Sequence, residues 1–188
     1  MRSLLRAVTL AACLLSATAS MAQSQNAVSA AKLCAIVIDW QKERSRATKI
    51  VDALGDRGIR SGLLLFSTED DAGPLDVRST ADIVFSAKPA LIAIHLSSFY
   101  SHVKGVDNQS FGEFFRLIET AGAQASPPYL PHYVIYSRAE IDDNSIKEWS
   151  GLPTGPYAAR TEIIGLTSIP SAERVAVILS SVPEISCE

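Results

Sequence analysis

The chain has 188 residues, of which 47% are hydrophobic and 20% are charged. This balance is typical of one compact globular domain and excludes a disordered or repeat-rich chain. With 17 basic against 20 acidic side chains, the protein lacks the positive charge of a nucleic-acid binder, and its 3 cysteines are too few for a disulfide-based scaffold.

Residues 1–22 have the pattern of a secretory signal peptide. A short cationic start precedes an apolar run over residues 7–19, which cannot span a bilayer because a spanning helix needs about 20 apolar residues. Small residues follow at Ser20 and Ala22, the positions that a signal peptidase inspects, so we predict cleavage before Gln23. We expect a bacterial protein that is periplasmic or secreted, with no membrane insertion after cleavage.

Residues 10–13 (LAAC) also resemble the lipobox of bacterial lipoproteins. Lipidation of Cys13 would leave only residues 7–12 as the apolar stretch, so we favour cleavage before Gln23 and keep lipoprotein anchoring at Cys13 as an alternative. Both readings place the protein outside the cytoplasm.

Cleavage changes the charge and the set of cysteines. Loss of Arg2 and Arg6 leaves 15 of the 17 basic side chains against 20 acidic ones, a surface with no attraction for nucleic acid or anionic lipid. Cys34 and Cys187 remain as a pair in an oxidising compartment, and we predict a disulfide between them that closes a loop of roughly 150 residues. Two unpaired buried thiols are the alternative.

Apolar runs alternate with amphipathic stretches after a polar leader over residues 23–31 that we expect to be flexible. In chain order we predict a strand over 34–38, a helix over 41–54, a strand over 59–66, a helix over 75–87, a strand over 90–96, a helix over 110–122, a strand over 133–137, a helix over 144–149, a strand over 162–166 and a helix over 171–182. Ser110 and Glu113 form a capping box for the third helix. The sequence thus predicts a single α/β domain over residues 32–188, an open parallel sheet with helices on both faces.

In such a sheet, binding and reactive groups gather at the carboxyl ends of the strands. The residues predicted to lie there are Asp39, Trp40, 67–71, 95–98, 137–140 and 167–171. The same geometry places Cys34 and Cys187 together at the opposite edge, which supports the disulfide.

Three segments resemble the receiver domain of bacterial response regulators. Residues 34–39 (CAIVID), followed by Glu43 and Arg44, resemble the first receiver strand and the start of its helix. Residues 86–95 (SAKPALIAIH) resemble the run into the phosphoacceptor strand, and residues 164–170 (IGLTSIP) resemble the fifth strand and the proline that begins the last helix. The resemblance implies a flavodoxin-like sheet of strand order 2-1-3-4-5.

The chemistry of that family does not carry over. Asp39 matches the first of two acidic Mg²⁺ ligands, but Trp40 stands where the second would be, and a Trp cannot bind the ion. His95 stands at the phosphoacceptor position, Ser137 matches the hydroxyl residue after the fourth strand, and the lysine after the fifth strand corresponds to Ser168 or Ile169. We therefore expect a degenerate site that is not phosphorylated and that binds no metal.

Other chemistries have weaker signals. Asp39, His95 or His102, and Ser97 or Ser98 could meet at one sheet edge as a hydrolase site, but the chain has no Gly-x-Ser-x-Gly elbow. No glycine-rich phosphate loop follows the first strand, and no closely spaced His or Cys pair is present, so we expect no nucleotide cofactor and no zinc.

Two long connections, residues 99–109 and 124–131, are candidate binding loops because connections of that length are often functional. The candidate binding residues are Trp40, His95, Tyr100, His102, Tyr129 and Ser137. The sequence thus favours an exported receiver-like binding or signalling module that acts through contacts with another protein at the cell envelope. A hydrolase that uses Asp39, His95 and Ser97 or Ser98 is the alternative.

Overall fold

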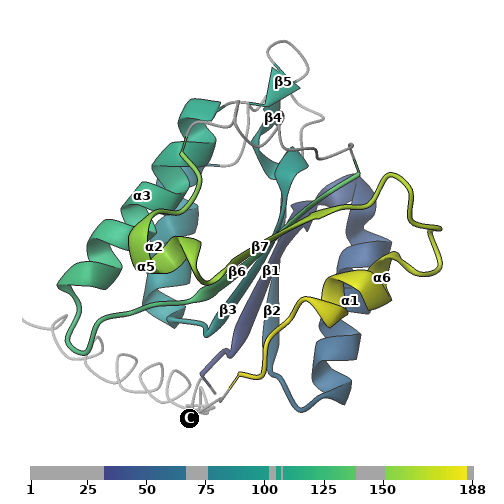
Figure 1. The fold of residues 1–188 in the computed structure, drawn as a ribbon, viewed down its shortest axis with the longest axis horizontal. Coiled ribbons are helices and arrows are strands. Elements are labelled where there is room, and N and C mark those ends of the chain that lie inside the picture. The colour runs from purple at the N-terminus through teal and green to yellow at the C-terminus, as the bar shows by residue number, and fades with distance from the viewer. Residues whose placement is uncertain (1–31, 67–75, 102–104, 107, 139–150, 186–188) are drawn as a thin grey trace, which may run out of the picture. The chain divides into compact units, whose positions relative to one another are not determined.

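The computed structural model describes residues 32–66, 76–101, 105–106, 108–138 and 151–185. Its five-stranded sheet consists of β1 (Ala35–Trp40), β2 (Ser61–Phe66), β3 (Leu91–His95), β6 (His132–Ser137) and β7 (Thr161–Gly165). All neighbouring strands of this sheet are parallel, and their order in space is β2-β1-β3-β6-β7 (Figure 1). When only the five strands of this sheet are numbered in chain order, β6 is the fourth and β7 the fifth, and the order is 2-1-3-4-5. The predicted flavodoxin-like α/β fold is therefore confirmed.

Helices cover both faces of the sheet (Figure 1). The helices α2 (Val77–Ala87), α3 (Asn108–Gln124) and the short α5 (Gly155–Ala158) lie on one face, and α1 (Arg44–Asp56) and α6 (Arg174–Ser180) lie on the other. A 3₁₀ turn, η1 (Gln41–Glu43), joins β1 to α1, and a second, η2 (Leu96–Phe99), follows β3. Each crossover returns the chain to the same end of the sheet, so the carboxyl ends of all five strands share one edge.

Alternation along the strands separates two hydrophobic cores. Ile36 and Ile38 of β1 belong to the core beneath α2 and α3. Ala35 and Val37 belong to the core beneath α1 and α6. Because side chains in a strand alternate between faces, the next residue, Asp39, lies on the α1 side of the sheet.

The predicted strands lie within a few residues of the observed ones, and the helices differ more at their ends. The helix α3 begins at Asn108, so Ser110 lies inside the first turn. The capping box of Ser110 and Glu113 is therefore wrong, because two residues before the serine already have helical backbone. The helix α6 begins at Arg174 rather than at residue 171, after a run of turns from Ser171 to Glu173.

Two elements were not predicted, the helix α5 and a small antiparallel hairpin of β4 (Tyr100–Ser101) and β5 (Gly105–Val106). The predicted signal peptide, the leader over 23–31 and the helix over 144–149 lie outside the described residues. Cys34 is buried immediately before β1, but Cys187 is also outside the described part of the chain, so the disulfide stays a prediction. None of the described helices has the length and hydropathy needed to cross a bilayer.

We expect the substitution Gly122→Ala to destabilise the fold. A Cβ atom there would lie 2.5 Å from the carbonyl oxygen of Tyr129 and 2.6 Å from the hydroxyl of Tyr157. Overpacking of this kind costs about 1–3 kcal/mol. Thermal unfolding followed by circular dichroism measures the change.

Gly55→Ala is the matched control, because a Cβ atom at Gly55 in α1 has no neighbour within 4 Å. We expect this variant to be neutral or stabilised by up to about 1 kcal/mol, as is usual for alanine in place of glycine in a helix. Equal melting temperatures for the two variants would contradict the close approach at Gly122.

Candidate functional site

Asp39 and His95 meet at the carboxyl edge of the sheet, as the sequence predicts. Asp39 stands near the end of β1 and His95 ends β3, the strand paired with β1. The Asp39 Oδ1 to His95 Nδ1 distance is 3.9 Å. Both residues are almost completely buried, with exposures of 0% and 4%.

A buried arginine neutralises Asp39. The Nη2 group of Arg46, from the first turn of α1, donates hydrogen bonds to Oδ1 at 2.9 Å and to Oδ2 at 3.0 Å of the carboxylate. The backbone N–H of Trp40 also donates to Oδ1, at 2.7 Å. Asp39 lies on the α1 face, so α1 can bring a cation directly against it.

Tyr136 completes the shell around Asp39. Its hydroxyl donates to Asp39 Oδ2 at 3.0 Å, and its ring lies 5.6 Å from the guanidinium carbon of Arg46. The His95 ring meets the same tyrosine edge to face, with centroids 5.2 Å apart. Tyr136 thus contacts the carboxylate, the guanidinium and the imidazole together.

An outer layer of ion pairs connects this cluster to the surface. Glu43 of η1 lies 3.4 Å from Nη1 of Arg46 and also pairs with the exposed Arg138, which follows β6. The Thr167 hydroxyl donates to the carbonyl oxygen of Arg138 at 2.7 Å, so the segment after β7 is attached as well. The chain segments that follow β1, β6 and β7 are thereby held together.

Burial and charge set the protonation of the cluster. Burial lowers the pKa of His95 to about 3, and the positive charges of Arg46 and then Arg138 act in the same direction, so the imidazole is neutral at physiological pH. Burial also raises the pKa of Asp39, although the charge of Arg46 and the hydrogen bonds from Trp40, Arg46 and Tyr136 oppose that rise.

The proposed hydrolase residues meet only in part. The 3.9 Å between Asp39 and His95 exceeds hydrogen-bond range, so the carboxylate does not orient the imidazole as an acid orients a catalytic histidine. Ser98 of η2 is buried, and its hydroxyl has no hydrogen-bond partner within the described ranges. The side chain of Ser97 and all of His102 lie outside what the structure describes.

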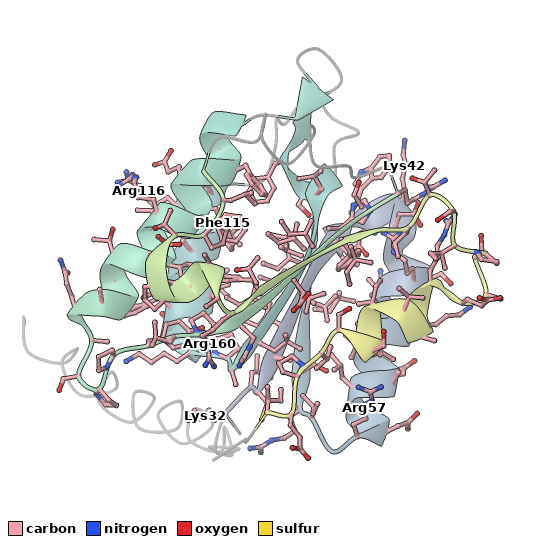
Figure 2. The ribbon with its side chains drawn as sticks, viewed as in Figure 1. Lys32, Lys42, Arg57, Phe115, Arg116 and Arg160 are labelled. Carbon is pink, nitrogen blue, oxygen red and sulfur yellow. The ribbon has the colours of Figure 1, made fainter. Side chains whose placement is uncertain are left out.

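The candidate binding residues divide between two edges of the domain. Trp40 is partly exposed at the carboxyl edge, where Lys42 lies 5.2 Å from its ring, and Figure 2 shows Lys42 at the opposite end of the sheet from Lys32. Tyr129 belongs instead to the amino edge, because its hydroxyl donates to the carbonyl oxygen of Pro89, just before β3. Tyr129 therefore lies away from Trp40 and His95, and its role as a binding residue stays a prediction.

Ser137 and the residues after β7 complete the comparison with the predicted site. Ser137 is buried at the end of β6 and alternates with Tyr136, so Tyr136 rather than Ser137 shares the face of Asp39. Ser168 is exposed and Ile169 partly exposed. For Tyr100, the backbone is described in β4 but its side chain is not.

Sequence reasoning missed Arg46 and Tyr136. Both carried a signal: Arg46 falls seven residues after Asp39, in the second turn of the predicted helix, and Tyr136 is a residue with a polar hydroxyl near the end of a buried strand. An arginine in an amphipathic helix normally lies on the solvated face, so its position in the sequence did not indicate a buried role.

No protein-family model, curated protein or solved structure matches this chain. Within the described ranges, no group of three or more His, Cys, Asp or Glu side chains is placed to hold a metal ion. The proposed function therefore rests on the buried cluster of Asp39, Arg46, His95 and Tyr136 at the carboxyl edge of the sheet.

We expect Tyr136→Phe to lower the free energy of unfolding by about 1–3 kcal/mol, because it removes a buried donor and leaves Asp39 Oδ2 with less compensation. Urea denaturation provides the measurement. Tyr133→Phe in the same strand is the control, because the Tyr133 hydroxyl is buried without a hydrogen-bond partner in the described part of the chain. This control should be neutral or slightly stabilised, and an equal loss in both variants would contradict the role given to Tyr136.

Proposed function

We propose that this protein is an exported, receiver-like binding module that contacts a partner protein at the cell envelope and does not undergo phosphorylation. The observation that carries the proposal is the buried ion pair of Asp39 and Arg46, with Arg46 Nη2 within 3.0 Å of both carboxylate oxygens. The Asp39 carboxylate holds α1 against the sheet through Arg46, so it is not available to bind Mg²⁺ or to accept a phosphoryl group.

The residues at this edge do not fit the Mg²⁺ ion that a receiver domain would hold. The carboxylate of Asp39 already faces a fixed positive charge, which would repel a divalent cation placed beside it. Trp40 offers no oxygen ligand at the neighbouring position. A guanidinium therefore takes the place of a dissociable cation, and the edge keeps one state instead of switching with metal and phosphate.

The exposed groups around the buried cluster supply a surface for protein contacts. Trp40, Lys42 and Arg138 offer an aromatic ring and two cationic groups, and Thr167 is hydrogen-bonded to the backbone of Arg138. Aromatic residues and arginine are enriched at the centres of protein interfaces. A partner with an acidic and aromatic surface would complement this edge.

Incubation of the purified protein with acetyl phosphate and Mg²⁺ tests the absence of phosphorylation. Intact mass spectrometry should show no phosphoryl adduct. An adduct on His95 or Asp39 would overturn the proposal.

Capture experiments from envelope extracts test the binding surface. Trp40→Ala and Lys42→Glu should each remove a specifically captured protein, whereas Leu130→Ala, an exposed position near the amino edge, should retain it. If the Leu130→Ala protein loses the captured protein while the carboxyl-edge variants keep it, the surface is wrongly placed. Turnover of an ester panel that disappears in His95→Ala would support the hydrolase alternative instead.

A further inference from the structure

The strand β2 forms one edge of the sheet and is unusually apolar for an edge strand. Its sequence, SGLLLF, contains neither a charged residue nor a proline. Residues 61–65 all keep intermediate exposure, whereas every residue from Ala35 to Asp39 in the neighbouring β1 is buried. Exposed apolar edge strands are templates for pairing with another strand, and natural proteins usually protect them with charges, prolines or bulges.

The hydrogen-bond pattern identifies which backbone groups of β2 point away from the sheet. The N–H of Ala35 donates to the carbonyl oxygen of Arg60, and Ala35 pairs with Ser61, so Arg60 and every second residue after it face β1. The peptide groups of Ser61, Leu63 and Leu65 therefore point outward. Within the described ranges no other strand pairs with this side of β2.

The opposite edge of the sheet differs. There, β7 carries the exposed charge of Glu162 next to its outward-facing residues Thr161 and Ile163. The N–H of Tyr133 donates to the carbonyl oxygen of Arg160, so by the same alternation Ile163 is the outward-facing counterpart of Leu63. The two edges thus offer a matched comparison, because the β2 edge has no charged residue and the β7 edge carries Glu162.

We propose that β2 pairs with β2 of a second copy of this chain, in antiparallel orientation about a two-fold axis at Leu63. Leu63 would then face Leu63 of the second copy, and Ser61 would face Leu65, so that all three outward-facing residues find backbone partners. A two-fold axis perpendicular to the sheet keeps each face continuous, so the partly exposed Leu64 side chains meet on one face and Leu63 and Leu65 meet on the other.

Charge also favours a second copy as the occupant. No like charges stand opposite one another in β2, because the strand has none. The nearest cation, Arg60, would pair opposite Phe66, which puts the two Arg60 residues of the dimer about 20 Å apart at roughly 3.3 Å per residue. This edge is separate from the carboxyl-edge surface of Trp40 and Lys42, so the dimer and the proposed binding function can be tested independently of each other.

Sedimentation equilibrium of the purified full chain over a range of concentrations tests the proposal. The native protein should show a monomer–dimer equilibrium. Leu63→Pro removes one outward N–H without touching the β1–β2 ladder, and should raise the dimer dissociation constant at least about tenfold. Ile163→Pro makes the equivalent change at the β7 edge and should leave the dissociation constant unchanged.

Hydrogen exchange on the unmodified protein keeps the test valid if a proline variant fails to fold. The amides of Leu63 and Leu65 should become more protected as the protein concentration rises, and the amide of Ile163 should not. Three results would each overturn the proposal: a monomer at every concentration, a dimer whose dissociation constant is unchanged by Leu63→Pro, and amide protection at Leu63 that does not depend on protein concentration. Dimer loss in Ile163→Pro alone would do the same, because it would place the interface on β7.

Discussion

Replacing Arg46 with methionine is expected to lower the free energy of unfolding by about 3–5 kcal/mol, as is typical when one partner of a buried ion pair is removed. Asp39 has no exposed surface, and the substitution leaves its carboxylate without the cation that neutralises it. Methionine fills much of the same volume, so the loss measures charge more than packing. The two remaining donors, the Trp40 N–H and the Tyr136 hydroxyl, are neutral and do not replace the charge of the guanidinium. Urea denaturation at neutral pH gives the free energy of unfolding.

Two further proteins separate the ion pair from general damage to α1. The double variant Asp39→Leu with Arg46→Met removes both charges and should recover most of the lost stability, because apolar replacement of a buried pair is often neutral. Arg138→Ala breaks only the exposed pair with Glu43 and should cost no more than about 1 kcal/mol. A double variant as unstable as Arg46→Met would show that the arginine acts through packing.

The fold was predictable because its signals are local and repeated. Apolar runs such as residues 34–38 and 90–96 lie in strands buried on both faces, and continuous apolar sequence is what such strands require. The parallel order follows from a helix between successive strands. The hairpin of β4 and β5 and the helix α5 escaped prediction because two-residue strands and a single helical turn carry no detectable periodicity.

The site was predictable in its position but not in its partners. The carboxyl-edge rule placed Asp39 and His95 together, since β1 and β3 are neighbours in the sheet. It could not show that Arg46 would turn inward, because that depends on the approach of α1 to the sheet rather than on helical spacing. The position of Tyr129 could not be predicted for a related reason: a long connection has two ends, and composition does not show which edge of the sheet its aromatic residue contacts.

The buried imidazole of His95 should make the protein acid-sensitive. Its pKa is about 3 in the folded protein and about 6.5 in an unfolded chain, so between pH 3 and pH 6.5 the unfolded state binds the proton and the folded state does not. The titration of His95 therefore does not change the free energy of unfolding above pH 6.5. This free energy falls as the pH decreases from 6.5 toward 3, with a slope of up to about 1.4 kcal/mol per pH unit. Chemical denaturation at a series of pH values between 7 and 3 measures this slope.

His95→Asn cannot titrate, so its free energy of unfolding should depend less steeply on pH across that window, whatever packing is lost. Asp39 acts with the opposite sign, because its raised pKa stabilises the folded state at low pH and this contribution is lost as the pH rises through the folded pKa. Both proteins retain Asp39, so the difference between their slopes isolates His95. His132→Asn, at a less buried histidine that begins β6, should change the slope less. Parallel pH profiles for native protein and His95→Asn would mean that His95 binds its proton as readily in the folded as in the unfolded state, and the neutral, closed cluster proposed for the carboxyl edge would then be wrong.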